Sequence, residues 1–126
     1  DRDLVVCDKI DFDVARNATL RLLEGENPPD AILAFNDIIT YAAFDAIKSK
    51  GLRIPEDVAI IGFTDGDTAA FVTPRLSAIM DQAHVQGTKA CQLLMKSING
   101  DEKIYKEVVP MILKIRESSE KNLVKK

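Results

Sequence analysis

Residues 31–63 read AILAFNDIITYAAFDAIKSKGLRIPEDVAIIGF, and this stretch decides the fold class. It opens with an apolar run over residues 31–35 and closes with a second one over 58–63, each as long as a fully buried strand. Between them, apolar pairs recur at helical spacing over residues 38–50, which predicts a helix with one buried face. Gly51 is a natural left-handed stop for this helix. Strand, helix and strand in this order predict a βαβ unit.

The same alternation continues on both sides of this unit. The sequence predicts further strands over residues 4–7, 76–80 and 108–115, and further helices over 13–24, 67–71 and 83–98. Asp11 or Asp13 is the expected cap of the first helix. Pro110 indicates an edge position or an irregularity in the last strand. Alternating strands and helices predict an α/β fold, with a mostly parallel sheet flanked by helices and joined by right-handed crossovers.

Composition and charge exclude several classes of protein. The chain has 126 residues, of which 46% are hydrophobic and 29% charged, as in an ordinary globular domain. Its net charge of -3 argues against nucleic-acid binding by this segment. No apolar run approaches the ~18 residues of a membrane span. Cys7 and Cys91 each lie in an apolar stretch, which predicts two buried free thiols rather than a disulfide.

Short polar side chains follow every predicted strand of the sheet. In such sheets, ligands bind beyond the carboxyl ends of the strands. Carboxylates, amides and hydroxyls there suit a sugar, whose hydroxyl groups both donate and accept hydrogen bonds. Phe12 could add an apolar wall for a sugar ring. The alternative is that these residues only cap helices and form turns. They are Asp8, Asn36, Asp37, Thr64, Asp65, Asp81 and Gln82.

Catalytic and metal-binding patterns are weak. His84 is the only histidine and has no evident catalytic partner. The sequence contains neither a phosphate loop nor a dinucleotide-binding glycine fingerprint. One histidine and two separated cysteines do not make a zinc site. Asp65 and Asp67 could hold Mg²⁺, but acids are common in turns. We therefore predict no enzymatic activity, no metal and no cofactor.

Four blocks in order resemble the lac repressor/galactose repressor (LacI/GalR) family of bacterial transcription regulators. They are residues 29–37 (PDAILAFND), 51–63 (GLRIPEDVAIIGF), 73–79 (TPRLSAI) and 115–119 (IRESS), and the resemblance covers roughly residues 20–119. It implies a periplasmic-binding-protein-like fold, in which two α/β lobes clamp a small sugar-like effector. The effector would shift the population of two forms and so change affinity for operator DNA. Such a regulator is cytoplasmic.

The resemblance also implies a division of the chain. Residues 1–126 would be part of an effector-binding domain, mainly its C-terminal lobe. Residues 1–82 and 108–119 would form that lobe, 83–107 would cross to the other lobe, and 120–126 would be a polar tail. Operator DNA would be bound by an N-terminal helix-turn-helix outside this sequence, not by this segment. Helix 83–98 would expose an apolar face without the other lobe.

Individual site residues carry over unevenly. Asn36 matches the family's sugar-contacting Asn at a strand end. Thr64 stands where the family usually has Asp, and Asp65 comes one step later, so bidentate acceptance from two sugar hydroxyls is weakened. Phe12 lies near the family's aromatic wall. The predicted ligand-binding residues are therefore Asn36, Thr64, Asp65 and Phe12.

Relatives in this family dimerise through the C-terminal lobe, so we expect a homodimer. The candidates for its apolar face are Tyr41, Phe44, Phe71 and Val72. The alternative is ordinary core packing, above all for Phe44 and Phe71.

Two other functions fit this fold class. The first is a lobe of a secreted sugar-binding protein of a transporter, which the ending 116–119 (RESS) argues against. The second is a phosphorylatable receiver domain, which needs an acid pair after the first strand and a late lysine. Asp8 stands without an adjacent acid, and the late strand is followed by Asp81-Gln82 and not by a lysine.

Overall fold

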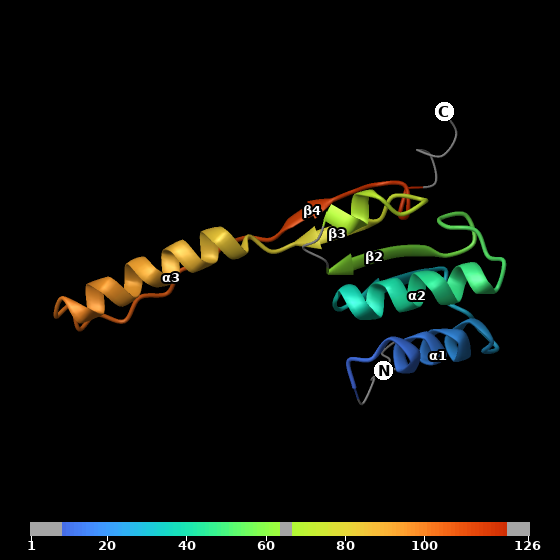
Figure 1. Ribbon diagram of the computed structural model, residues 1–126, viewed down its shortest axis with the longest axis horizontal. Helices are drawn as coiled ribbons and strands as arrows, with labels where there is room; N and C mark the ends of the chain where they lie inside the picture. The colour runs from blue at the N-terminus through green and yellow to red at the C-terminus, as the bar shows by residue number, and fades with distance from the viewer. Residues whose placement is uncertain (1–8, 64–66, 121–126) are drawn as a thin grey trace.

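The computed structural model describes residues 9–63 and 67–120. It contains a four-stranded sheet in the order β1-β2-β3-β4 (Figure 1). The first three strands are parallel and β4 is antiparallel to β3, so the prediction of a mostly parallel sheet is confirmed. The strands are β1 (Ala31–Ala34), β2 (Ala59–Phe63), β3 (Ser77–Met80) and β4 (Ile112–Lys114). The predicted strand 4–7 lies outside the described residues.

Helix α2 lies on the sheet, α1 lies beside α2, and α3 forms a projecting arm. Helix α2 packs on β1 and β2, and α1 packs on α2 (Figure 1). Helix α3 extends away from the sheet, and none of its residues is buried. The elements are α1 (Phe12–Leu23), α2 (Asp37–Ser49), the 3-10 helix η1 (Asp67–Ala70) and α3 (Ala83–Ile98). None of the helices in the described ranges has the length and apolar character to cross a membrane.

Local capping sets the helix ends close to where the sequence predicts them. Asp11 accepts a hydrogen bond from the Val14 backbone N–H at 3.1 Å and caps α1. Asn36 does the same for the Ile39 N–H at 2.9 Å and caps α2. Gly51, with φ of 71°, ends α2 in the left-handed region that glycine tolerates.

The hydrophobic core lies between α2 and the sheet. Its largest fully buried side chains include Ile47, Ile60 and Leu76. Phe44 and Ile54 join them, so the core-packing alternative is confirmed for Phe44. These contacts bring α2 close to the sheet and hold the end of β1 and the start of α2 in place, since burial of apolar side chains supplies most of the stability.

Three predictions about burial and length are wrong. In β1, Ala34 is buried but Leu33 is 63% exposed, because alternate side chains of a strand point to opposite faces and α2 packs on one of them. Cys91 is free as predicted, but it is exposed because it lies on α3. The last strand is shorter than 108–115, since pairing covers only Ile112–Lys114 and begins after Pro110. Its edge position is confirmed.

Candidate functional site

The carboxyl ends of the parallel strands lie on one side of the domain. Figure 1 places the ends of β2 and β3 and the starts of α1 and α2 on this same side. Asn36 lies two residues after the end of β1, and Asp81, which is exposed, follows β3 directly. Thr64 and Asp65, the predicted site residues after β2, lie outside the described residues. The architecture thus brings the ends of neighbouring strands to one edge, where α/β sheets bind ligands.

Asn36 is held in place by the turn that it caps. Its side-chain Oδ1 accepts the Ile39 N–H, and its backbone carbonyl accepts the Thr40 hydroxyl at 2.6 Å. Within the described residues, no hydrogen bond engages the side-chain amide nitrogen of Asn36. The cap function is therefore confirmed, and it leaves the two amide donors of Asn36 available to a ligand.

Thr40 connects this turn to strand β2. Its side chain is fully buried and lies directly over Gly62 of β2, where a Cβ atom would come within 2.4 Å of the Thr40 Oγ1 and Cγ2. The absence of a side chain at residue 62 lets the first turn of α2 sit close to the strand. Sequence reasoning missed this contact because the two residues are far apart along the chain.

The remaining predicted residues differ in their surroundings. Phe12 begins α1, whose start lies on the same side of the domain as the start of α2, and it is 42% exposed. Asp37 is exposed in the first turn of α2. The side-chain amide of Gln82 is engaged within the domain, because its Nε2 donates to the Pro110 carbonyl at 2.7 Å. Asp8 lies outside the described residues.

The residues of the predicted apolar dimer face are also distributed unevenly. Phe71 is 81% exposed, which contradicts its assignment to the core. Tyr41 and Val72 are partly buried against the core. The hydroxyl group of Tyr41 is buried and has no hydrogen-bond partner among the described residues.

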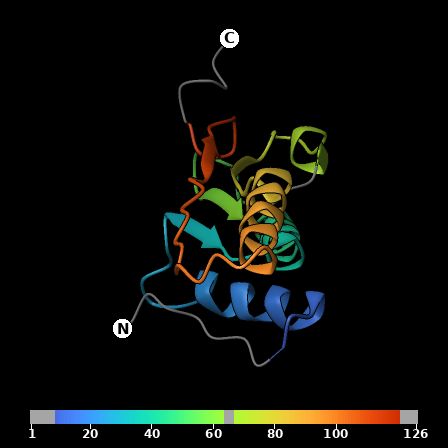
Figure 2. The same ribbon diagram turned by 90° about the vertical axis from the view of Figure 1, so that its left-hand side faces the viewer.

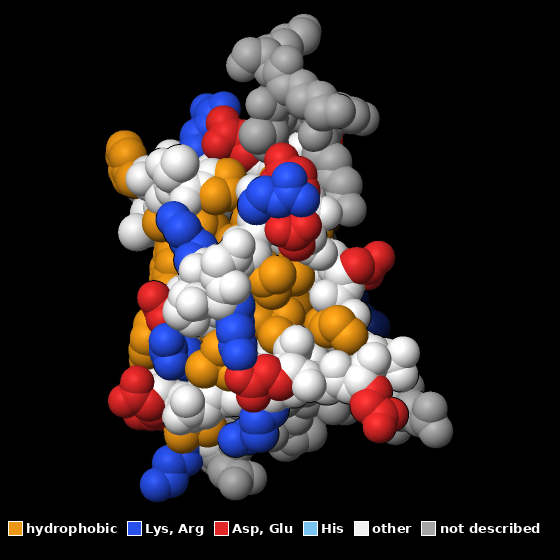
Figure 3. All heavy atoms as spheres, turned by 90° about the vertical axis from the view of Figure 1, so that its right-hand side faces the viewer, with side chains coloured by type: hydrophobic (Ala, Val, Ile, Leu, Met, Phe, Trp, Pro, Cys, Tyr) orange, Lys and Arg blue, Asp and Glu red, His pale blue; other side chains and the backbone are white. Residues whose placement is uncertain are grey.

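Within residues 9–63 and 67–120, no three His, Cys, Asp or Glu side chains gather where they could hold a metal ion. His84 lies with Gly87, Cys91 and Met95 in an open groove along α3. On the side of the molecule opposite α3, basic and acidic side chains are interspersed and form no basic patch (Figure 3).

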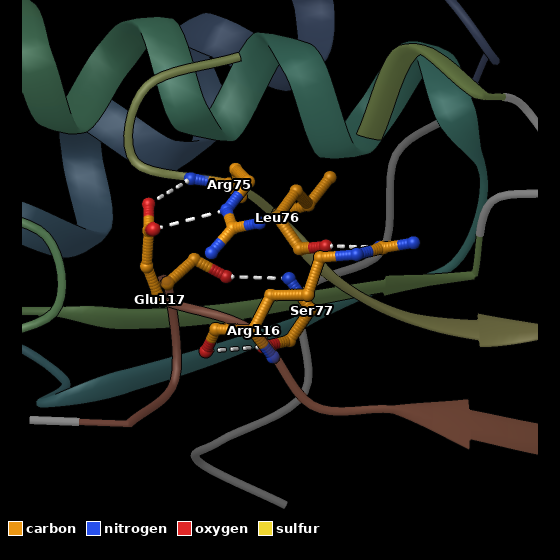
Figure 4. Close-up of polar contacts among 6 residues, drawn as sticks. Arg75, Leu76, Ser77, Arg116 and Glu117 are labelled. Atoms are coloured by element: carbon orange, nitrogen blue, oxygen red, sulfur yellow. Dashed lines mark hydrogen bonds and ion pairs between the residues drawn. The ribbon is translucent and has the colours of Figure 1, made fainter. Parts of the chain in front are cut away.

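A polar network lies at the opposite end of the strands, where β3 begins (Figure 4). The backbone N–H of Ser77 donates to the Ser118 hydroxyl at 2.8 Å, and that hydroxyl donates to the Ile60 carbonyl at 2.6 Å. The guanidinium of Arg116 donates to the Leu76 carbonyl at 2.5 Å. This network fastens the segment after β4 to β2 and β3, so its function is structural.

Glu117 in this network makes stability depend on pH. The Arg75 backbone N–H and Nε each donate to its carboxylate at 2.9 Å, and these bonds lower the pKa of Glu117 below its ordinary value. Because the folded-state pKa is lowered, the stabilisation is present above the unfolded pKa and is lost as pH falls through the folded pKa. We expect Glu117→Gln to lower the free energy of unfolding at neutral pH and to have little effect near about pH 3. Urea unfolding at both pH values measures this, and an equal loss at both would contradict it.

Comparison with known proteins agrees with this architecture. Residues 4–119 match the family described as periplasmic binding protein-like domain, so the chain has a fold of that class. The probable HTH-type transcriptional repressor ExuR of Bacillus subtilis is 36% identical over 92 residues, which cover 73% of this chain and 28% of that protein. The lactose operon repressor of Rhizobium radiobacter is 36% identical over 100 residues, 79% of this chain and 88% of that sequence.

A solved structure of a LacI-family regulator also matches this chain. The LacI family transcriptional regulator of Arthrobacter sp. FB24 in complex with lactose matches with a TM-score of 0.80 and 29% identity, over 93% of this chain and 44% of that one. The chain therefore belongs to the periplasmic binding protein-like family, and its relatives there are LacI-family transcription regulators.

Proposed function

We propose that this chain is the ligand-sensing part of a bacterial transcription regulator, which binds a small sugar-like effector in a cleft between two lobes. The observation that carries the proposal is Asn36, which a helix cap holds at the carboxyl edge of the sheet with its amide donors unengaged. A sugar hydroxyl can accept from such an amide and donate to a neighbouring carboxylate. The Arthrobacter relative with lactose supports a sugar as the class of ligand.

The division into lobes is part of the proposal. Residues 1–82 and 108–119 form the C-terminal lobe, and 83–107 cross to a second lobe. The support is that α3 leaves the sheet and buries none of its side chains within the described chain. Exposed apolar residues on α3, such as Leu94 and Ile98, would then be covered by the second lobe.

The regulator acts in the cytoplasm as a homodimer that holds operator DNA through an N-terminal domain. Relatives described as HTH-type transcriptional repressors support the DNA-binding step. Phe71, which is 81% exposed, is the side chain here that a second copy would cover. The effector is contacted by Asn36, Thr64, Asp65 and Phe12. No metal or cofactor takes part in this binding.

Two substitutions at Asn36 separate capping from ligand binding. Asp caps a helix as well as Asn does, and its charge suits the helix N-terminus, but it lacks the amide donors. Asn36→Asp should leave the free energy of unfolding within about 0.5 kcal/mol of the parent and weaken sugar binding roughly ten-fold. Asn36→Ala should lose about 1 kcal/mol of stability and the binding as well.

The measurements are urea unfolding, and calorimetric titration of the complete gene product with a panel of mono- and disaccharides that includes lactose. Unchanged sugar affinity in Asn36→Asp would remove Asn36 from the proposed site. Absence of binding across the panel in the parent protein would remove the sugar class itself.

The alternative function is a lobe of a secreted sugar-binding protein of a transporter, which uses the same fold without DNA. The coding DNA upstream of Asp1 distinguishes the two. A helix-turn-helix followed by a first lobe supports the regulator. A signal peptide before the first lobe supports the transporter protein, and the proposed binding to operator DNA is then withdrawn.

A further inference from the structure

Helix α3 and the chain that returns from it form an arm, residues 83–109, which joins the sheet through two adjacent connecting segments, 81–82 and 110–111. Figure 2 looks at the domain from the arm side and shows the return segment beside α3. Lys89 Nζ forms an ion pair with Glu107 at 2.6 Å, and Lys96 Nζ lies 4.6 Å from the centre of the Tyr105 ring. These contacts tie the helix to the return segment, so the arm is held together along its length.

The join between arm and sheet has a break in its strand pairing. The last pair of the antiparallel ladder is Met80 with Ile112. Continuing the same register by two residues places Gln82 opposite Pro110. Proline has no backbone N–H, so Pro110 cannot donate a hydrogen bond to the neighbouring strand. Regular pairing between the two connecting segments therefore ends where the arm begins.

The side chain of Gln82 makes one hydrogen bond across this break. Its Nε2 donates to the Pro110 carbonyl at 2.7 Å. Gln82 also occupies the N-cap position of α3, yet its side chain makes no capping hydrogen bond there. The amide instead spans the two connecting segments across 28 residues of sequence.

We propose that Gln82 is a positioning residue, whose hydrogen bond to Pro110 latches the hinge between the sheet and the arm. The role of this hinge rests on the proposed function: if α3 lies in a second lobe, the hinge opens and closes the effector cleft. The hydrogen bond itself does not depend on that function. A main-chain ladder would hold the two segments rigidly, whereas a single exposed side-chain hydrogen bond biases the arm toward one orientation and still breaks during motion.

Spin labels on the arm and on the sheet layer test the latch. Cys91 on α3 carries one label in a Cys7→Ser background, and Ser49→Cys at the exposed end of α2 carries the other. The distance distribution between them is measured by pulsed electron resonance. Gln82→Ala should raise the population of unlatched orientations roughly five-fold, as expected for loss of one hydrogen bond, and so broaden the distribution.

Two variants make the result decisive. Gln92→Ala removes a second, exposed glutamine from the same helix and should leave the distribution unchanged. Pro110→Ala keeps the carbonyl acceptor and adds an N–H, so it should leave the distribution as narrow as in the parent, or narrower. An unchanged distribution in Gln82→Ala, or equal broadening in Gln92→Ala, would overturn the latch. The measurement needs no effector, so failure of the sugar screen and failure of the latch are separate results.

Discussion

Gly62→Ala should lower the free energy of unfolding by about 1–3 kcal/mol, the usual cost of overpacking a closed core. A Cβ atom at this residue would come within 2.4 Å of both the Oγ1 and Cγ2 atoms of Thr40. Thr40 cannot move away easily, because it is fully buried and its hydroxyl donates to the Asn36 carbonyl at 2.6 Å. Urea unfolding followed by circular dichroism measures the loss.

Gly87→Ala is the matched control for this substitution. Gly87 lies inside α3, and nothing lies within 4 Å of the Cβ that alanine would add. Alanine is favoured over glycine in a helix by about 0.5–1 kcal/mol, so α3 should gain helical stability. Thr40→Ala combined with Gly62→Ala should recover part of the loss, since the two side chains no longer compete for the same space. Parent-like stability in Gly62→Ala alone would contradict the close approach of α2 to β2.

Ser118→Ala should cost about 2–4 kcal/mol, because it leaves two buried backbone groups without a partner. The Ser118 hydroxyl accepts from the Ser77 N–H at 2.8 Å and donates to the Ile60 carbonyl at 2.6 Å. Ser118 is itself fully buried, so water cannot replace the lost hydroxyl without entering the core. The change is measured by urea unfolding of the parent and the variant.

Ser119→Ala tests whether any serine in this segment has the same effect. Among the described residues, the Ser119 hydroxyl bonds only the Ser77 hydroxyl, at 2.7 Å, in a partly buried position. We expect a loss below about 1 kcal/mol, the net value of an ordinary hydrogen bond. Equal losses in the two variants would show that the contacts of Ser118 with β2 and β3 do not set the stability of this segment.

The helices were predictable from sequence because their signals are local. The spacing of apolar residues over 38–50 and the cap at Asn36 involve contacts within one or two turns, and α2 forms there. Gly51 ends the helix for a reason contained in its own backbone. The mostly parallel sheet follows from the alternation of these elements with strands.

Burial was less predictable, because an apolar run does not say what covers it. Residues 31–35 were predicted as a fully buried strand, yet Leu33 and Phe35 are exposed on the face of β1 that α2 does not cover. Cys91 lies in an apolar stretch of the sequence but on a helix that packs on no core. Both errors arise because burial depends on neighbouring layers, and local sequence carries no information about which layers are present.

The candidate site was predicted in part. Asn36 and Phe12 lie at the carboxyl side of the sheet as expected, whereas Thr64 and Asp65 fall outside the described residues and stay predictions. Gln82 was grouped with the ligand-facing residues, but its side chain bonds Pro110. A residue at a strand end can point to several partners, and sequence position alone does not choose among them.

The sequence by itself determined the element order, the helix caps and the class of fold, because these depend on side chains a few residues apart. The tertiary structure alone decided three other features: how closely α2 approaches Gly62, how Ser118 satisfies the backbone of two strands, and that Gln82 bonds Pro110. Each of these depends on groups that lie 22 to 58 residues apart in the chain, which meet only after the layers have packed.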